Sequence, residues 1–473
     1  MSRLLCVSRR WARALLVLGL GAPSAWAQGP SLVLQPTSQD ARRFPDIVLL
    51  SVDTLRYDRL SGNGYKRRTS PAIDALMGAG VQFDQARVVE PLTCPSMASL
   101  LTSLHPHEHG ASRNGLSVRP DLPSLPQMLA SKNYSTGAFV GNWTLRNELS
   151  GLGEFFETYE EVVSRKRWFG LFFSEATAED LNDEAMSWIR DQVKARDRRP
   201  FFAWVHYVEP HAPYRFWDEL APGLGPGLDR GDPSDRYDTE VAFVDRAIGA
   251  FLAELESLVP KKDTLVLFVS DHGESLGEHG YWGHGRNLHE PGLRIPMSMT
   301  WSGRLKPARV EAPASILDLM PTLLGLLDLR VAGALQGYDW SPWLRGEVPA
   351  PMDRVTYHQA HRGAVQGGGD SKNARRRGLL RVASVDARGR KEIVEDDGRN
   401  FRFFNLRSDP GEQKGSTPKG RRTAAEGQER APSSGLLEWL ESVQRGLAAS
   451  DDLPPPSLGS EDLEQLRALG YID

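Results

Sequence analysis

The sequence predicts an α/β protein in which helices cover a large, mostly parallel sheet. Ile47–Val52 and Leu265–Val269 are continuous apolar runs, which are typical of strands buried on both faces. Between residues 45 and 345 such runs alternate with helical stretches, the pattern of a layered α/β domain. The first run leads into Asp53 and the second into Asp271-His272, at the edge where ligands gather in such sheets.

The first 27 residues have the features of a signal peptide. Three arginines between residues 9 and 13 precede the short apolar core Ala14–Leu20, and Ala-Trp-Ala at 25–27 fits a cleavage site before Gln28. An uncleaved anchor is the alternative, but the apolar run is too short to cross a bilayer. We therefore expect export to the periplasm or the cell exterior, with no stable membrane span.

Composition limits the classes of partner. Of 473 residues, 40% are hydrophobic and 25% charged, as in an ordinary globular protein. Removal of the signal peptide leaves 53 basic and 61 acidic residues, a net charge of −8, so no nucleic-acid partner is expected. Cys94 is then the only cysteine, which excludes an intrachain disulfide, and we expect it to be a small residue at a tight turn. The oligomeric state stays open.

The remaining elements follow in chain order. Residues 28–44 are expected to be a linker, residues 45–345 a catalytic α/β domain, and residues 346–473 a small C-terminal subdomain with a tail. In the catalytic domain we predict strands at Ser135–Val140 and Phe201–Val205, a surface loop at 218–236 and a helix at Thr239–Leu255. In the subdomain we predict a loop at 366–377, strands in Gly378–Val385 and Lys391–Leu406, and helices at Ser433–Leu447 and Ser460–Leu469.

A threonine lies between the two carboxylate-ending strands in sequence. Pro95 suits the first position of a helix, so Thr93 is expected just before a helix N-terminus, where backbone N–H groups favour an anion. Two carboxylates, a histidine and a hydroxyl gathered at one edge indicate a metal site that activates a nucleophile. The alternatives are that Thr93, Asp53 and Asp271 only cap helices.

Six strings occur together in this chain: IVLLSVDTLRYDRL, LTCPSMASLLTSLHPHEHG, WVHYVEPHAPY, YDTEVAFVDRAIGAFL, VSDHGESLGEHGYWGHG and FFNLRSDPGE. On these strings, which cover about Pro45 to Arg407, the chain resembles the sulfatase family of the alkaline-phosphatase-like superfamily. The resemblance implies a sandwich with a large mixed, mostly parallel sheet between helices, plus a small C-terminal α+β subdomain.

The resemblance also implies a ligand set for one divalent ion: Asp53, Asp271 and His272, completed by the Thr93 oxygen. Family members carry Asp-Asp at the first string, where this chain has Asp53-Thr54, and often Asp-Asn at the second. One carboxylate fewer and one imidazole more favour zinc or manganese over calcium.

Further roles follow from the same resemblance. His211 matches a residue near the leaving group, and His284 stands where sulfatases carry a lysine, so either could protonate a departing alkoxide. Asn142 and Thr54 are expected to contact the substrate. His206 falls in the same strings and is expected to support the site from behind.

The chain departs from the family at its nucleophile. Sulfatases convert the first residue of C-x-P-S-R to formylglycine; the aligned residue here is Thr93, with Cys94 one place later and Met97 in place of the arginine. We therefore expect hydrolysis of phosphate esters, in particular diesters or phosphonate esters, in two displacements. The alternatives are a sulfuric ester hydrolase that works without formylglycine and a catalytically silent binding protein. The substrate is expected to be an anionic ester of a small molecule, glycan or lipid, and transfer to another hydroxyl stays open.

Overall fold

The computed structural model describes residues 44–164, 174–329, 335–361, 380–395, 400–416 and 431–451. Its largest element is an eight-stranded sheet, formed by β1 (Asp46–Val52), β2 (Val81–Arg87), β3 (Ser135–Val140), β4 (Thr158–Glu161), β7 (Phe201–Tyr207), β8 (Thr264–Ser270), β11 (Met297–Trp301) and β12 (Ala308–Ser315). The strand order is β12–β2–β11–β8–β1–β7–β3–β4. Only β11 is antiparallel to its neighbours in this sheet, which confirms the predicted mixed, mostly parallel architecture.

Strand β1 shows why a continuous apolar run marks the centre of such a sheet. Successive side chains point to opposite faces. Ile47 and Leu49 pack into the core on one face, and Val48, Leu50 and Val52 pack into the core on the other. Because both faces are buried, no position in the strand can be polar without a partner.

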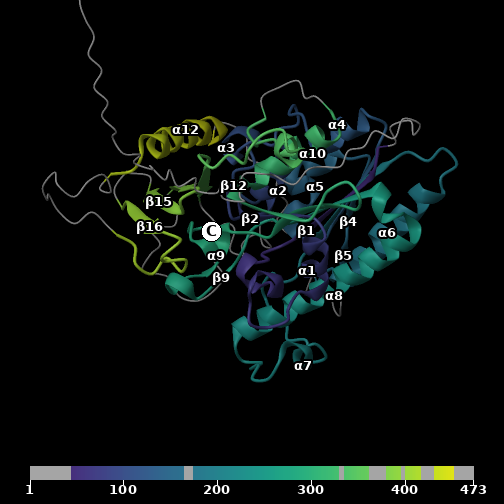
Figure 1. Cartoon of the computed structure of the whole chain (residues 1–473), viewed down its shortest axis with the longest axis horizontal. Helices are drawn as coiled ribbons and strands as arrows, with labels where there is room; N and C mark the ends of the chain where they lie inside the picture. The colour runs from purple at the N-terminus through teal and green to yellow at the C-terminus, as the bar shows by residue number, and fades with distance from the viewer. Residues whose placement is uncertain are drawn as a thin grey trace, which may run out of the picture.

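Two layers of helices enclose the sheet, as predicted (Figure 1). One face is covered by α1 (Pro71–Gly78), α6 (Ala178–Lys194) and α8 (Pro233–Leu258), and the other by α2 (Thr93–Thr102), α4 (Leu125–Ala130) and α10 (Leu319–Leu326). The short helices are α3 (Pro106–His109), α5 (Asn147–Ser150), α7 (Ala221–Leu224), α9 (Glu290–Leu293) and α11 (Ser341–Leu344).

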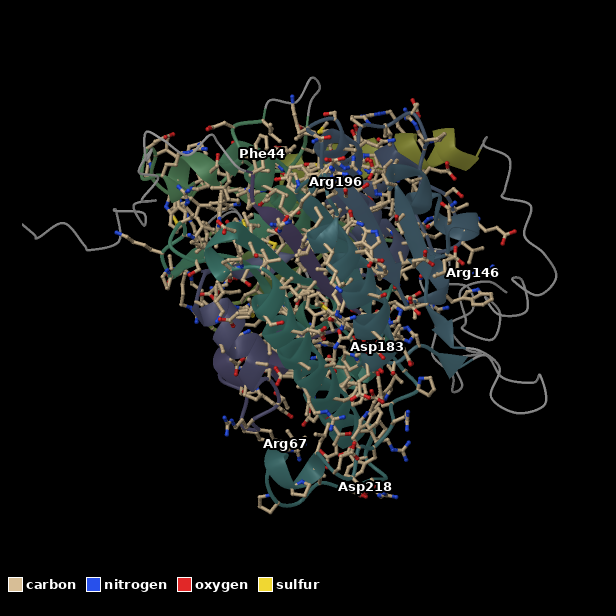
Figure 2. The ribbon with its side chains drawn as sticks, turned by 90° about the vertical axis from the view of Figure 1, so that its right-hand side faces the viewer. Phe44, Arg67, Arg146, Asp183, Arg196 and Asp218 are labelled. Carbon is tan, nitrogen blue, oxygen red and sulfur yellow. The ribbon has the colours of Figure 1, made fainter. Side chains whose placement is uncertain are left out.

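The parallel strands share a direction, which Figure 2 makes visible. Phe44 and Arg196, which precede β1 and β7, lie at one end of the sheet, and Arg67 and Asp218, which follow them, lie at the other. The segments after the strands therefore gather at one edge. Two small ribbons also occur: β5 (Val163–Ser164) with β6 (Ser174–Glu175), and β9 (Ser275–Leu276) with β10 (Trp282–Gly283).

A second, antiparallel sheet follows in the C-terminal part. Its strands are β13 (Val355–Ala360), β14 (Arg381–Asp386), β15 (Arg390–Glu395) and β16 (Arg402–Asn405), in that order. Helix α12 (Ser434–Asp451) covers it, with Leu436, Leu440 and Val443 packed on Val382 and Val394. This sheet and its helix confirm the predicted small α+β unit, whereas the predicted domain boundary at residue 345 stays a prediction.

Buried ion pairs join the small sheet to the large one. Lys391 of β15 is fully buried and pairs with Glu290 at 2.9 Å and with Glu412 at 2.8 Å. Arg87 at the end of β2 pairs with the same Glu290 at 2.8 Å. Two cations thus balance two carboxylates, so none of these charges is buried uncompensated.

Two expectations need correction. The predicted loop at 218–236 contains α7 and the start of α8, because Asp232 caps that helix (Ser234 N to Asp232 Oδ1, 2.8 Å) and Pro233 takes its first position. Helix α2 begins at Thr93, not after it, because Leu92 is the extended residue before the helix and Pro95 is the third helical residue. Proline fits there since N–H groups of the first turn lack intrahelical partners.

Strands β2, β4, β11 and β12 were not predicted. In β2 the buried Val81 and Phe83 alternate with half-buried Gln82 and Asp84, so no continuous apolar run exists. Edge strand β12 contains Pro313 and an irregular register, features that argue against a strand on sequence grounds and are tolerated at an edge.

Several expectations fall outside the described residues: the signal peptide at 1–27, most of the linker at 28–44, the loop at 366–377 and the helix at Ser460–Leu469. Among the residues that the structure does describe, no helix has the length and apolar character needed to cross a membrane.

Candidate active site

The candidate site lies where the two central strands end. Val52 of β1 pairs with Ser270 of β8, so Asp53 and Asp271 leave the sheet side by side. Backbone hydrogen bonds continue one step past the strands, from Asp53 N to Tyr207 O (2.9 Å) and from Asp271 N to Val52 O (3.2 Å). Both carboxylates are fully buried and fixed by the sheet itself.

The structure brings the four expected ligand residues together. Ligand atoms of Asp53, Asp271 and His272 all lie within 4.8 Å of one another. His272 Nε2 is 3.7 Å from Asp53 Oδ1 and 3.5 Å from Asp271 Oδ2. Thr93 Oγ1, from the first residue of α2, lies 3.4 Å from the same nitrogen.

Hydrogen bonds around the cluster leave one oxygen on each carboxylate without a donor. Asp271 Oδ1 accepts from Thr54 N (3.0 Å) and His272 N (2.6 Å), and Asp53 Oδ2 accepts from the Asn142 amide. Asp53 Oδ1 and Asp271 Oδ2 are buried and have no hydrogen-bond partner. Buried carboxylate oxygens without donors are costly unless a cation serves them.

The histidine has the tautomer that a metal ligand needs. His272 Nδ1 lies 2.9 Å from the carbonyl oxygen of Gly273, which can only accept, so the proton is on Nδ1. Nε2 therefore carries its lone pair toward the two carboxylates. Two carboxylate oxygens, an imidazole nitrogen and a hydroxyl are donors that suit a divalent ion, so the residues present fit the divalent ion that the resemblance implies.

Burial and mutual charge shift the acidities of these groups. Burial raises the pKa of Asp53, but His211, His206 and His272 outweigh it and hold that pKa below its usual range. Burial and then the charge of Asp53 raise the pKa of Asp271 well above normal. Burial, with His284 beside it, lowers the pKa of His272 to about 3, which keeps the ring neutral and able to bind a cation.

Thr93 and Cys94 face different surroundings. Cys94 packs in the apolar core with Met97, its Sγ lies 3.8 Å from Leu116 O, and burial raises the pKa of its thiol to about 12. The Cys94 thiol is therefore inert, whereas Thr93, at the start of the helix, faces the cluster. Ser96 Oγ ties the same first turn to Asp271 O at 2.5 Å.

Two further histidines flank the cluster. The His284 ring lies 4.4 Å from the His272 ring and 5.4 Å from the His211 ring, centroid to centroid. His284 Nδ1 contacts Glu274 Oε1 at 3.1 Å, and His211 Nδ1 contacts Ala212 O at 2.7 Å. Both partners accept hydrogen bonds, so each ring carries its proton on Nδ1.

The two residues expected at the substrate have defined contacts. Asn142 donates to Asp53 and accepts from Thr144 N and Oγ1, both at 2.7 Å, so its amide is held by the protein. Thr54 adopts φ 53°, an outlier for a β-branched residue, and its Oγ1 is buried without a hydrogen-bond partner. Such backbone strain is typical of functional sites.

Sequence reasoning missed two supports of the site. Glu274, fully buried behind His284, also accepts from Tyr214 OH (3.0 Å). Ser51, the next-to-last residue of β1, contacts His206 Nδ1 at 2.8 Å. A serine inside an otherwise apolar buried strand is the signal that could have revealed this second support.

Within the described residues a second group of metal-ligand type is formed by His279, His289 and Glu412. Both oxygens of Glu412 are already engaged, by Lys391 Nζ at 2.8 Å and by Glu290 N at 2.7 Å. This group therefore belongs to the ion-pair junction between the two sheets.

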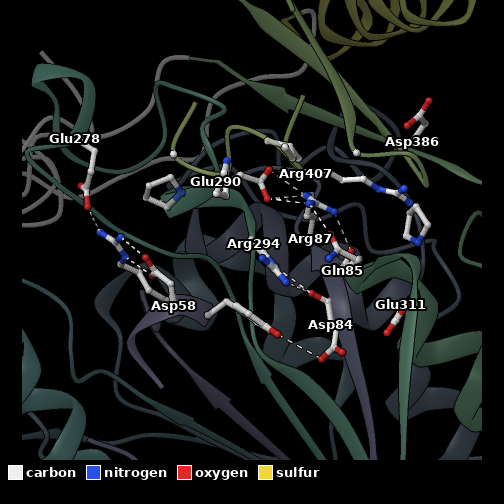
Figure 3. Close-up of a pocket in the computed structure, with 18 of the residues that line it drawn as sticks. Asp58, Asp84, Gln85, Arg87, Glu278, Glu290, Arg294, Glu311, Asp386 and Arg407 are labelled. Atoms are coloured by element: carbon white, nitrogen blue, oxygen red, sulfur yellow. Dashed lines mark hydrogen bonds and ion pairs between the residues drawn. The ribbon is translucent and has the colours of Figure 1, made fainter. Parts of the chain in front are cut away.

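A pocket of about 860 Å³ lies beside that junction (Figure 3). Arginines line it, and the figure shows two of them with partners: Arg87 with Glu290 and Gln85, and Arg294 with the backbone oxygen of Asp84. None of the residues of the buried cluster lines this pocket. The pocket and the buried cluster are therefore separate features of the described structure.

Comparison with known proteins identifies sequence relatives of this chain. A sequence profile of the family described as Sulfatase matches residues 45–329. The chain is 26% identical to the ulvan-active sulfatase of Formosa agariphila over 66% of this chain and 67% of that one.

Solved structures show the same fold. The chain is similar to Ps i-CgsB in complex with k-i-k-neocarrahexaose (TM-score 0.64, 22% identity, covering 90% and 97% of the two chains). It is also similar to the phosphonate monoester hydrolase of Agrobacterium radiobacter (TM-score 0.61, 20% identity, covering 86% and 96%).

Proposed function

The chain belongs to the sulfatase family, and we propose that it is a metal-dependent member that hydrolyses phosphate esters, in particular diesters or phosphonate esters, with Thr93 as nucleophile. One observation carries the proposal: Thr93 Oγ1 lies 3.4 Å from the candidate metal ligand His272, whereas Cys94 packs in the core. The residue facing the cluster is thus a threonine where the resemblance expects formylglycine.

The proposed ligands are Asp53, Asp271, His272 and Thr93, and one zinc or manganese ion per chain is preferred over calcium. When bound, such an ion would lower the pKa of the Thr93 hydroxyl and neutralise charge on the transferred group. The two buried carboxylate oxygens without donors support this ligand set.

The chain's own residues supply the rest of the mechanism. Thr93 Oγ1 attacks the phosphorus in line, from the start of α2, where backbone N–H groups stabilise negative oxygens. Thr93 loses its hydroxyl proton to solvent as it attacks. His211 or His284, in the form that carries a proton on Nε2 as well as on Nδ1, donates the Nε2 proton to the departing oxygen. Water then attacks the phosphorylated threonine in line and gives one proton back to that histidine, and the displaced Thr93 oxygen takes up a proton to regenerate the hydroxyl. We propose that the substrate's reacting end contacts Thr54 and the side-chain amide of Asn142, which also donates to Asp53.

A sulfuric ester hydrolase without formylglycine is the second candidate, because a relative that is 26% identical is described as an ulvan-active sulfatase. Phosphate is preferred on chemical grounds. A formylglycine sulfate can release sulfate from its own hemiacetal carbon, but a threonine sulfate would require attack at sulfur. A threonine phosphate can be cleared by a second in-line attack.

For the organic part of the substrate we propose a glycan. The relative that acts on ulvan and the structure that holds a neocarrahexaose make a glycan-linked ester the first substrate to test. Export by residues 1–27 would place the enzyme where such polymers occur.

A turnover screen tests the function. Matched aryl phosphodiester, phosphonate monoester, phosphate monoester and sulfate substrates are compared after adding zinc, manganese or calcium to metal-free protein. We expect kcat/KM for the diester or phosphonate to exceed that for the sulfate by at least ~10-fold, about 1.4 kcal/mol of barrier. A preference for the sulfate would favour the second candidate, and no turnover with bound metal would favour a silent binding protein.

A further inference from the structure

A buried relay runs beneath the candidate metal site. Trp204 Nε1 can only donate, and it lies 2.7 Å from Ser51 Oγ. The Ser51 hydroxyl is thus an acceptor for Trp204 and has one proton to give. His206 Nδ1, at 2.8 Å, is a much closer acceptor than Val205 O, at 3.5 Å.

The relay sets the tautomer of His206. If Ser51 donates to Nδ1, the neutral ring carries its proton on Nε2. That nitrogen is buried, has no hydrogen-bond partner and lies 3.8 Å from Asp53 Oδ2. The distance is longer than a hydrogen bond, but the N–H dipole faces the carboxylate and a shift of under an ångström would close it.

Two donors therefore converge on the same oxygen of Asp53. The Asn142 amide, after β3, and the His206 ring, at the end of β7, both face Oδ2. Asp53 Oδ1 has no hydrogen-bond donor and lies 3.7 Å from His272 Nε2. This asymmetry fixes which oxygen is left for a cation.

We propose that His206 is a positioning residue for the metal: the Trp204–Ser51–His206 relay holds Asp53 by Oδ2 and presents Oδ1 to the ion. The inference rests on the proposed function, because it requires the ion that Asp53, Asp271 and His272 would bind. Residues that hydrogen-bond a metal ligand typically raise metal affinity by ~10–100-fold. His206 does not itself need to touch metal or substrate.

Three substitutions at one position separate the two nitrogens. Gln places an amide N–H near the Nε2 position, Asn places its amide near Nδ1, and Ala removes both. His109→Ala is the matched control, because His109 is also fully buried and also contacts a serine (Nε2 to Ser99 Oγ, 2.9 Å). The full chain is stripped of metal, and the Kd for Zn²⁺ and Mn²⁺ is measured by competition with a chromophoric chelator, beside the thermal midpoint of each metal-free variant.

We expect His206→Ala and His206→Asn to raise the Kd by ~10–100-fold, His206→Gln to recover most of the affinity, and His109→Ala to leave it unchanged. Wild-type affinity in all three His206 variants would overturn the inference and leave the proposed function standing. So would a loss of kcat at unchanged Kd, which would show that His206 contacts substrate, or equal weakening by His109→Ala. A wild-type chain that binds no divalent ion would overturn the proposed function and this inference together.

Discussion

Replacing Thr93 should remove turnover while leaving the fold nearly intact. The Thr93 hydroxyl lies 3.4 Å from His272 Nε2 and also interacts with the Asp271 carboxyl, so its loss costs about 1 kcal/mol of unfolding free energy. Thr93→Val keeps the buried volume, and Thr93→Ala removes one methyl group as well, which adds about 1 kcal/mol. If Thr93 forms the bond to phosphorus, both variants should lose at least ~100-fold in kcat, about 2.7 kcal/mol of barrier.

The assay is kcat on an aryl phosphodiester with saturating zinc or manganese, beside thermal unfolding of each variant. Cys94→Ala is the matched control, because it removes a neighbouring core group at a similar cost in stability and should keep turnover within a few-fold. An inactive Cys94→Ala with an active Thr93→Val would refute the reasoning, since it would place the nucleophile one residue later.

Three further results are expected. Asp271→Ala and His272→Ala should each lose the one divalent ion per chain that elemental analysis measures in the wild type. After chelation, zinc or manganese should restore the activity of the wild-type enzyme better than calcium, and the opposite order would reject the proposed ligand set. His284→Gln should slow esters with an alkyl leaving group more than those with a nitrophenyl one, because only the former need a proton donor; equal slowing would argue against His284 as the acid. Burial raises the pKa of Asp245 from 3.8 to about 6, so the folded chain holds that proton more tightly and stability falls as pH rises through this window. Asp245→Asn removes the titrating group, at a pH-independent cost of one of its two backbone hydrogen bonds, and should therefore flatten the fall of the thermal midpoint between pH 4 and pH 7; an unchanged slope would contradict the shift.

The sequence was informative where burial on both faces forced a simple pattern. β1, β3, β7 and β8 are fully buried, so their apolar runs were visible without any structure. The residues that end β1 and β8 could then be placed together, because parallel strands end at a common edge.

Strands with one half-exposed face or an irregular register could not be predicted from the sequence. Gln82 and Asp84 interrupt β2, and the ion-pair partner of Asp84 comes from a segment distant in the chain, since Arg309 lies 2.7 Å away. His206 was expected behind the site, but the convergence of Asn142 and His206 on one oxygen of Asp53 could not be predicted, for the same reason. It depends on three strand ends meeting, and no local pattern encodes that meeting.

The stereochemistry at phosphorus tests the central claim most directly. A chiral aryl phosphorothioate diester is hydrolysed in heavy-oxygen water with the reconstituted enzyme, and the configuration of the product is determined. Two in-line displacements, first by Thr93 and then by water, predict net retention of configuration. Net inversion would show that water attacks phosphorus directly and would contradict Thr93 as the nucleophile.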